Sequence, residues 1–140
     1  MKKTLKIGDT ASIRRIFTEV DVRAYAELST DFNPVHLDPE FAASTQFGQR
    51  IVHGMLVSSL FSALLGQHLP GAGSIYMGQN IKFRAPVFLD QEVIASVEII
   101  DIRGDKPIVK VKTLCLDTAG KVLVTGDAVM YVPWLEQISA

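Results

Sequence analysis

Hydrophobic and polar positions follow different patterns in the two halves of the chain. From Gly54 to about His68 the sequence GMLVSSLFSALLGQH is apolar almost throughout, and serines are the main interruptions. A segment of this length that is apolar on all sides is typical of a helix that is buried on every side. Pro70 and Gly71 follow and end it. We therefore predict one long buried helix near the middle of the chain.

The second half is rich in β-branched and aromatic residues, with stretches in which apolar and polar positions alternate. This pattern predicts strands. The turn sequences RGDKP and DTAGK separate three of them, and such short connections favour antiparallel pairing. One apolar helix followed by long strands predicts a two-layer α+β domain, in which an antiparallel sheet wraps around the helix. The predicted strands lie in 74–88, 91–102, 107–117 and 121–132.

The first fifty residues predict shorter elements. ASIRRIF is a candidate first strand. Thr18 precedes EVDVRAYAELS, and Asp21 three residues later completes a weak capping-box signal for a helix. Asp38 as an N-cap and Pro39 at the first helical position predict a short helix in PEFAAS. The sequence shows no repeat or linker, so we expect residues 1–140 to form a single domain.

Composition and charge narrow the classes of function. The net charge is −1, so there is no cationic excess for binding a phosphate backbone. A single cysteine, Cys115, excludes an internal disulfide and makes a reducing cytoplasm the simplest location. The basic start MKKTLKIGDT has no apolar run behind it, so we expect no signal peptide. The apolar central segment is too short and too polar for a membrane span.

The segment DFNPVHLDPE carries the first chemical signal. Pro34 restricts Asn33 to extended conformations and stiffens the loop between Asp31 and His36. A carboxylate and an imidazole on one rigid loop are the minimum set for general acid–base catalysis. The alternative is an ordinary polar loop, in which Asp31 or Asn33 makes a side-chain turn and His36 lies at the surface.

The sequence IVHGM is the second signal. Gly54 begins the apolar helix, and a helix N-terminus offers unpaired N–H groups at the positive end of its dipole. A glycine there allows a ligand to approach the backbone, which suits stabilisation of a developing oxyanion. The alternative is a plain glycine N-cap. His53 has two interpretations, as a catalytic residue or as a structural histidine at the helix entry.

Polar residues within the apolar helix and the first predicted strand of the second half offer further candidates. Ser58 and Ser62 are four residues apart and share one side of the helix, where Ser62 has the option of binding substrate or orienting a catalytic group. The alternative is that these serines bond back to their own helix. Lys82 and Arg84 share one face of a strand and are candidates for binding phosphate groups, although a solvated face is the simpler interpretation.

A metal site has weak support in the sequence. Asp31, His36, Asp38 and His53 supply ligand atoms, but no H-x-x-x-H pair or paired cysteines accompany them. We therefore expect no metal. Cys115 lies within a predicted strand with no base nearby in sequence, which is typical of a core residue.

Taken together, these segments resemble the MaoC-like (R)-specific enoyl-CoA hydratases. The resemblance covers nearly the whole chain in the right order and departs at none of the core positions. The combination of D-x-N-P-x-H with the downstream H-G-M carries its specificity. It implies a hot-dog fold, with the long helix wrapped by the sheet, and usually a homodimer. The matching residues are DFNPVH at 31–36, Asp38-Pro39, IVHGM at 51–55, Phe83 and Pro86-Val87.

The resemblance also implies an activity in acyl-CoA and fatty acid metabolism. In the family, Asp31 would activate a water for attack on C3 of a trans-2-enoyl-CoA, and His36 would donate a proton to C2. Both additions occur on one face and give an (R)-3-hydroxyacyl-CoA. The Gly54 N–H would polarise the thioester carbonyl, and Ser62 would support the catalytic pair. No metal or redox cofactor is implied, since coenzyme A is part of the substrate.

Other expectations remain open at this point. Asn33 either orients the loop or binds substrate, and Leu65 and Met130 are candidates for lining the acyl pocket. Related hot-dog proteins act as 3-hydroxyacyl-carrier-protein dehydratases or as thioesterases, and dehydration uses the same residues in reverse. A non-catalytic acyl-thioester-binding subunit is a further alternative, but the presence of both Asp31 and His36 argues against it.

Overall fold

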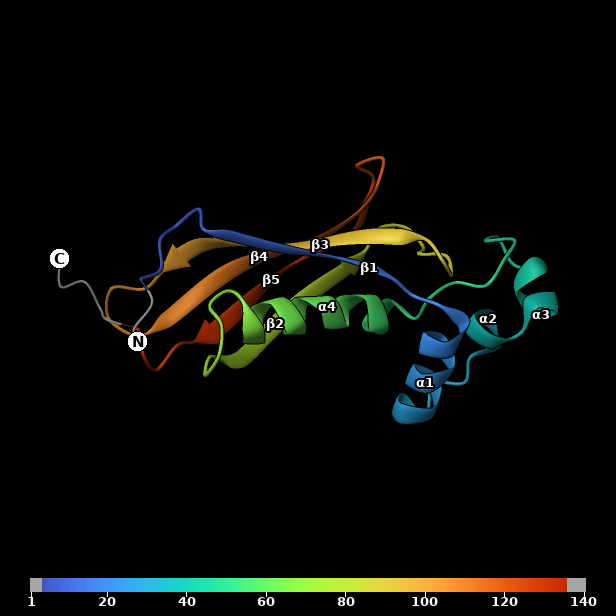
Figure 1. The fold of residues 1–140 in the computed structure, drawn as a ribbon, viewed down its shortest axis with the longest axis horizontal. Helices are drawn as coiled ribbons and strands as arrows, with labels where there is room; N and C mark the ends of the chain where they lie inside the picture. Colours follow the sequence, from blue (N-terminus) through green and yellow to red (C-terminus); the bar gives the residue numbers. More distant parts are fainter. Residues whose placement is uncertain (1–3, 136–140) are drawn as a thin grey trace.

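A computed structural model describes residues 4–135 as a five-stranded sheet with one long helix along a face and three shorter helices beyond its end (Figure 1). The predicted α+β architecture is confirmed. The strands are β1 (Thr10–Ile16), β2 (Ile75–Phe83), β3 (Glu92–Ile102), β4 (Ile108–Asp117) and β5 (Val122–Tyr131). The helices are α1 (Glu19–Ser29), α2 (Pro34–Leu37), α3 (Pro39–Ala43) and α4 (Gly54–Gln67).

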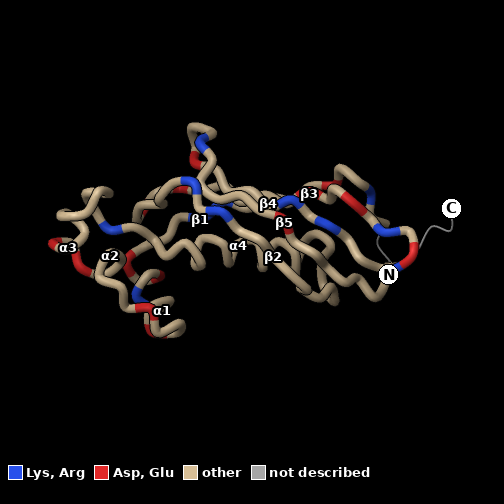
Figure 2. Tube along the Cα trace, turned by 180° about the vertical axis from the view of Figure 1, so that it is seen from behind, with Lys and Arg blue, Asp and Glu red and all other residues tan. Residues whose placement is uncertain are grey.

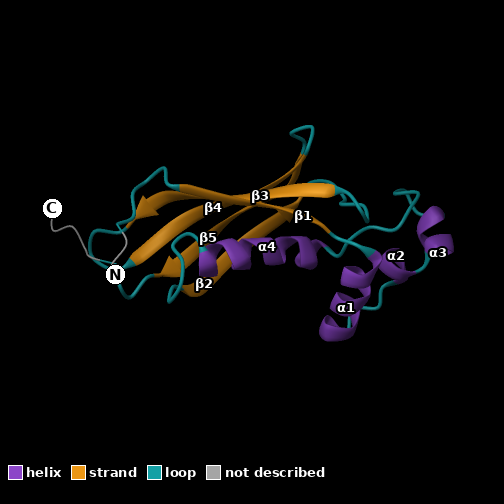
Figure 3. Ribbon diagram, viewed as in Figure 1, coloured by secondary structure: helices purple, strands orange, loops and turns teal. Residues whose placement is uncertain are grey.

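All pairings in the sheet are antiparallel, in the order β1-β3-β4-β5-β2. The two predicted turns form the β3–β4 and β4–β5 hairpins. Strands β1 and β2 lie at the two edges, so the chain crosses between them through all four helices (Figure 3). This crossing carries α4 along the sheet and leaves the α1–α3 segment at the N-terminal end of α4.

Helix α4 packs its apolar side on the sheet. Phe61, Leu64 and Leu65 are fully buried against core residues of the strands. The prediction that this helix is buried on every side is wrong for the described chain. Met55 is 56% exposed, and Ser59 and Ser62 are also exposed along one stripe of the helix. The serines had hidden this stripe, because small residues do not break an apolar pattern as charges do.

The short helices begin where the capping signals predicted. The Thr18 side chain accepts a hydrogen bond from the Asp21 N–H, and the Asp21 carboxylate accepts one from the Thr18 N–H. The Asp38 side chain accepts hydrogen bonds from the first turn of α3, which begins at Pro39. These caps fix the α1–α3 segment that carries Asp31 and His36.

Charged residues of both signs are spread over the sheet and the α1–α3 segment, as Figure 2 shows. Among the described residues, no helix is long and apolar enough to cross a membrane. The core is continuous from the sheet to α4, and Cys115 lies within it, fully buried, as predicted.

Candidate active site

Three side chains from separate elements meet at the N-terminus of α4. Asp31 follows α1, His36 belongs to α2, and His53 is the N-cap residue of α4. One ligand-type atom from each lies within 4.8 Å of the others. Thr30 brings the chain to this point by ending α1 in the left-handed region, with φ of 65°. The structure thus brings together the predicted pair and a third residue whose role the sequence left open.

The Asp31 carboxylate is held by its own loop. Oδ1 accepts a hydrogen bond from the Asn33 N–H at 3.1 Å, and the Asp31 N–H donates to Ser29 Oγ at 3.2 Å. The polar-loop alternative is therefore correct for one oxygen. Oδ2 accepts no hydrogen bond from the residues that the structure describes, and the residue is exposed. A carboxylate fixed through one oxygen leaves the other free for a ligand.

His36 is buried, with 8% of its surface exposed, against the expectation of a surface residue in a polar loop. Its Nδ1 lies 2.8 Å from the Ile51 carbonyl oxygen. A carbonyl only accepts, so Nδ1 carries the proton and Nε2 is the free nitrogen. Burial lowers the pKa of His36, opposed by the Ile51 hydrogen bond and by the Asp31 charge, while His53 lowers it further. The ring is oriented by its backbone partner, and burial favours its uncharged form.

The Asn33 side chain orients the loop. It is the N-cap of α2, and its Oδ1 accepts a hydrogen bond from the Val35 N–H at 3.1 Å. Pro34 follows at the first helical position, where its missing N–H costs nothing. This cap sets the direction in which α2 presents His36.

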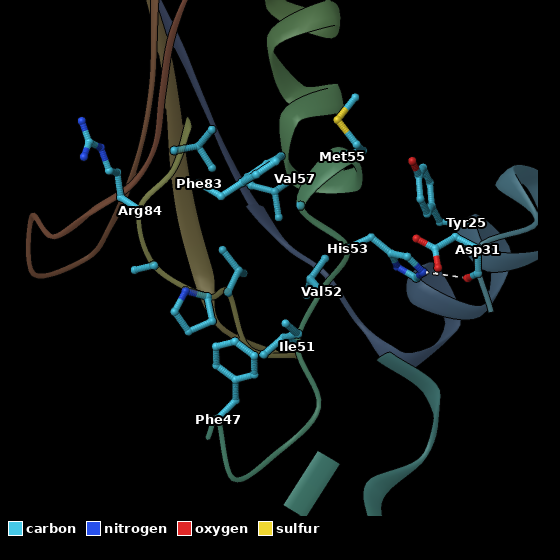
Figure 4. Close-up of a pocket in the computed structure, with 15 residues that line it drawn as sticks. Tyr25, Asp31, Phe47, Ile51, Val52, His53, Met55, Val57, Phe83 and Arg84 are labelled. Carbon is cyan, nitrogen blue, oxygen red and sulfur yellow. Dashed lines mark hydrogen bonds between the residues drawn. The ribbon is translucent and has the colours of Figure 1, made fainter. Parts of the chain in front are cut away.

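His53 is almost fully buried and contacts both members of the pair. Its Nε2 lies 3.1 Å from the Asp31 main-chain oxygen, the interaction drawn as a dashed line in Figure 4. Its ring stacks on the His36 ring, with 3.8 Å between centroids and 28° between planes. The Tyr25 ring, from α1, packs on the His53 ring with 4.8 Å between the two centroids. Sequence alone gave no signal for Tyr25, because only the fold brings α1 to this helix end.

A cavity of about 410 Å³ opens beside Asp31 and His53, whereas His36, stacked on the His53 ring, is not among its lining residues. Asp31 and His53 lie on one side of it and Phe83 and Arg84 on the opposite side (Figure 4). The remaining wall is mostly apolar, which suits an acyl chain more than a sugar or a free nucleotide. It is formed by Phe47, Ile51, Val52, Val57, Ala85, Pro86, Val87 and Val124, together with Tyr25, Gly54 and Met55.

Gly54 lines the cavity at the first position of α4. The first main-chain hydrogen bond of the helix runs from the Val57 N–H to the His53 carbonyl, at 3.1 Å. The N–H groups of Gly54 and the next two residues precede it, and the His53 side chain does not cap them. The helix end therefore presents free donors beside Asp31.

The same three residues form a cluster of metal-ligand type, but their arrangement does not suit a metal. Each imidazole directs one ring nitrogen at a main-chain carbonyl, which is compatible with ligation through the other nitrogen, so the relative orientation of the rings decides. The two rings stack, so their in-plane lone pairs do not converge on one point as a tetrahedral site requires. Asp38 is outside the cluster and caps α3. The geometry suits proton transfer better than metal ligation.

The serines of α4 behave as the simpler interpretation predicted. Ser58 donates to the Gly54 carbonyl at 2.9 Å and Ser59 to the Leu56 carbonyl at 2.5 Å, both within their own helix. Ser62 is not among the cavity residues. It lies on the exposed stripe and lines a neighbouring hollow with Tyr76, among others. Within one chain, Ser62 therefore makes no contact with Asp31 or His36 that would support the pair.

The predicted acyl-pocket residues lie deeper than the cavity. Leu65 and Met130 are buried in the core cluster, and neither lines the cavity. Leu65 is eleven residues after Gly54 along α4, about 16 Å at the helical rise. Val57, one turn into the helix, is instead part of the cavity wall.

Lys82 and Arg84 share one groove, as their alternation predicted. The groove, of about 260 Å³, also includes Lys112 from β4. Arg84 lines the cavity as well, so the groove begins at the cavity mouth. Sequence missed Lys112 because its place beside Lys82 depends on how β2, β5 and β4 pair. Asp127 is the acidic residue in the groove.

The fold is that of a hot-dog domain, with Asp31, His36 and His53 gathered at the N-terminus of its central helix. The chain belongs to the MaoC-like domain family, whose model matches residues 3–119. It is 51% identical over 131 residues to an (R)-specific enoyl-CoA hydratase of Aeromonas caviae, covering 94% of this chain and 98% of the relative. The family resemblance and the hot-dog fold inferred from sequence are confirmed.

Two further comparisons agree. A solved structure of the A. caviae (R)-hydratase involved in PHA biosynthesis superposes with a TM-score of 0.91, covering 94% of this chain and 99% of that one. A mitochondrial 3-hydroxyacyl-[acyl-carrier-protein] dehydratase of Arabidopsis thaliana is 41% identical over 140 residues, covering 98% of this chain and 83% of the relative. The family therefore includes both hydration and dehydration of acyl thioesters in its named members.

Proposed function

We propose that this chain is an (R)-specific enoyl-CoA hydratase, which reversibly adds water to trans-2-enoyl-CoA. The observation that carries the proposal is that Asp31 and His36, each with one unengaged side-chain atom, bring ligand-type atoms within 4.8 Å of each other beside a mostly apolar cavity that Asp31 lines. The identity to the A. caviae hydratase supports it. A water held between these atoms would lie over one face of a bound enoyl thioester.

The reaction follows from the two atoms. Asp31 takes a proton from the water as its oxygen forms a bond to C3, and the C2=C3 π electrons move to C2 and the thioester oxygen. In its reactive form His36 carries a second proton on Nε2, and it donates this proton to C2 on the same face, while Nδ1–H stays on the Ile51 carbonyl. Transfer of the Asp31 proton to His36 restores the pair. Addition from one face gives the (R)-3-hydroxyacyl-CoA.

Negative charge develops on the thioester oxygen during this addition. The free N–H of Gly54, at the positive end of α4, is the donor we assign to that oxygen. Asn33 supports the pair by capping α2. Coenzyme A enters as part of the substrate, and no separate cofactor or metal takes part in these steps.

The groove of Lys82, Arg84 and Lys112 is our candidate for the phosphates of coenzyme A. Arg84 lines both this groove and the cavity, so the two hollows adjoin. The groove contains these three cations and one acid, Asp127. Arginine and lysine are the usual partners of phosphate oxygens. The acyl chain would occupy the apolar cavity and, when longer, extend along α4 toward Leu65 and Met130.

Dehydration of 3-hydroxyacyl-carrier-protein is a second candidate, favoured by the 41% identity to the Arabidopsis dehydratase over nearly the whole chain. The same two side chains run the reaction in reverse. The two candidate functions therefore differ in whether coenzyme A or a carrier protein holds the acyl group. A carrier protein brings its acyl chain on a single phosphopantetheine phosphate, whereas coenzyme A adds a nucleotide with further phosphates.

We also propose that the chain forms a homodimer and acts in the cytoplasm. Strand β2 is at the sheet edge and pairs only with β5 within the described chain. Large apolar side chains are exposed on and beside it, among them Ile75, Met77 and Phe83 at 52%, 57% and 54%. The exposed stripe of α4 lies next to them, and both line one hollow. A second copy covering this face would remove an exposed edge and apolar surface together.

The test is hydration of crotonyl-CoA by the purified protein, followed by loss of the enoyl-thioester ultraviolet absorbance. Product stereochemistry is read with an enantiomer-specific dehydrogenase. Asp31→Asn keeps the acceptor for the Asn33 N–H but removes the base, so turnover should fall by about a hundred- to ten-thousand-fold.

Asp38→Asn is the matched control, since it makes the same change in the same loop and asparagine still caps α3. It should retain the parental rate. Turnover to the (S) product, or an Asp31→Asn variant as active as the control, would overturn the proposal. Activity confined to carrier-protein substrates would select the second candidate, and no turnover of either substrate would favour a binding subunit.

A further inference from the structure

We propose that His53 is a positioning residue that holds both members of the catalytic pair, Asp31 through its main chain and His36 through its ring. This inference rests on the proposed function and extends it to a residue outside the proton-transfer steps. It resolves the two interpretations that sequence left for His53.

The first contact is a hydrogen bond. His53 Nε2 lies 3.1 Å from the Asp31 main-chain oxygen, which only accepts, so Nε2 carries the ring proton. The bond joins the first residue before α4 to the turn after α1, 22 positions earlier. Asp31 is exposed, and the rest of its loop is held by contacts among neighbours within two residues. This bond therefore fixes the loop relative to Gly54, across the place where substrate binds.

The second contact is a stack. The ring centroids of His36 and His53 lie 3.8 Å apart, with 28° between the planes, and the Tyr25 ring packs on His53 with 4.8 Å between centroids. His36 is otherwise held by one hydrogen bond, from Nδ1 to the Ile51 carbonyl. A single hydrogen bond leaves a ring free to rock about it, whereas a flat surface against its face removes that motion. The stack thus fixes where Nε2 of His36 points.

The third observation concerns the remaining nitrogen. His53 Nδ1 is buried and has no hydrogen-bond partner among the described residues. A second proton on this ring would have no hydrogen-bond acceptor among the described residues. His53 is therefore suited to holding its neighbours and not to carrying the proton that the reaction moves. The proton is left to His36.

Two variants separate the contacts. His53→Phe keeps a ring for stacking but loses the donor to Asp31, and His53→Gln restores an N–H near the Nε2 position without the ring. In His53→Phe we expect kcat for crotonyl-CoA to fall by about ten- to a hundred-fold, as small misplacements of catalytic groups do, with KM changed less than about threefold. His53→Gln should recover part of this loss.

A double-mutant cycle distinguishes positioning from a general structural effect. If His53 acts through Asp31, His53→Phe should cost almost nothing further when Asp31 is already Asn. Additive losses, or parental kcat in His53→Phe, would overturn the inference. Should His53→Phe not fold, the cycle is run with His53→Gln, which lacks the ring that stacks on His36 and must then show a kcat loss that vanishes in the His36→Gln background.

A measurement that needs no activity keeps this inference separate from the proposed function. NMR of the ring nitrogens of the unmodified protein should find His53 as the Nε2–H tautomer and His36 as the Nδ1–H tautomer. Finding His53 protonated on Nδ1 instead would remove the bond to Asp31 and sink the inference, whatever the enzyme turns over. Correct tautomers with no hydratase activity would leave the positioning role of His53 intact and would reject the proposed function alone.

Discussion

The ring of Phe83 lies against Gly54 so closely that no side chain fits between them. A Cβ on Gly54 would meet Phe83 Cε1 at 2.6 Å and Cδ1 at 2.9 Å. Phe83 ends β2 and lines the cavity opposite Asp31, so this contact joins the helix start to the sheet edge at the cavity wall. The lack of a side chain at position 54 therefore allows Phe83 to pack against the helix start as part of the cavity wall. It also leaves the backbone open to the approach of a ligand.

Gly54→Ala should displace Phe83 without unfolding the protein. The ring is 54% exposed and can swing outward, whereas the α4 backbone cannot shift as easily. Since the N–H of residue 54 remains, we expect KM for crotonyl-CoA to rise by several-fold and kcat to change less. Gly66→Ala makes the same change in α4 where nothing lies within 4 Å, and should leave both constants unchanged. An unaltered KM in Gly54→Ala would contradict this account of the wall.

Much of the fold was predictable because its signals are local. Thr18 with Asp21, and Asp38 with Pro39, mark helix starts through contacts within three residues. The apolar run that begins at Gly54 and the alternating segments after it needed only the periods of a helix and of a strand. The proximity of Asp31 to His36 was likewise predictable, since they are five positions apart and one of the four residues between them is a proline.

The features that could not be predicted from the sequence depend on contacts between segments far apart along the chain. His53 meets Asp31 across 22 positions, and Lys112 joins Lys82 only through the pairing of three strands. Neither leaves a pattern along the chain. The exposed stripe of α4 was missed for another reason, because Ser59 and Ser62 suit both a buried and an exposed helix face.

Burial of His36 should make the stability of the protein depend on pH. Its folded pKa lies below the ordinary value of 6.5, so between the two values the unfolded chain binds more protons. The free energy of unfolding that comes from neutral His36 is complete above about pH 6.5 and is lost as the pH falls through the folded pKa. The stacked His53 ring and the Asp31 carboxylate are the titratable groups that face it.

This dependence can be measured by urea denaturation at about pH 7.5 and about pH 5. The parent should lose more stability over this range than His36→Gln, which cannot gain the proton. His68→Gln removes an exposed histidine outside the site and should behave as the parent does. Equal losses in the parent and in His36→Gln would show that burial of this ring does not govern its proton.

If the cationic groove binds phosphates, its residues should matter for an acyl-CoA substrate and not for a thioester without phosphates. Replacing Lys82 and Arg84 together by Ala should raise KM for crotonyl-CoA by about tenfold or more, because charge-assisted contacts to phosphate are lost. Crotonyl-N-acetylcysteamine has the same thioester without phosphates and should be turned over as by the parent. Lys110→Ala removes a β4 cation that does not line the groove and serves as control. Equal effects on both substrates would show that the phosphates of coenzyme A bind elsewhere.

Gly126 should be required for the pairing of β5 with β2. A Cβ at this position would lie 2.0 Å from the main-chain oxygen of Asn80, which cannot move without breaking the ladder. We expect Gly126→Ala to lower the free energy of unfolding by about 2 kcal/mol or more. Gly78→Ala, in the paired strand with nothing within 4 Å, is the control and should be near neutral. Equal midpoints of urea denaturation for the two variants would disprove this requirement.

The depth of Leu65 and Met130 predicts how chain length is set. The cavity wall reaches Val57, so a short acyl chain fits without reaching Leu65 or Met130, while a longer chain must extend between α4 and the sheet toward these two residues. Leu65→Ala or Met130→Ala should therefore raise kcat/KM for a long enoyl-CoA relative to crotonyl-CoA, while the void lowers stability by about 2–5 kcal/mol. Leu5→Ala trims a buried residue near the N-terminus and should lower stability without changing the ratio. If the ratio moves equally in all three variants, loosening of the core and not the path of the acyl chain would account for it.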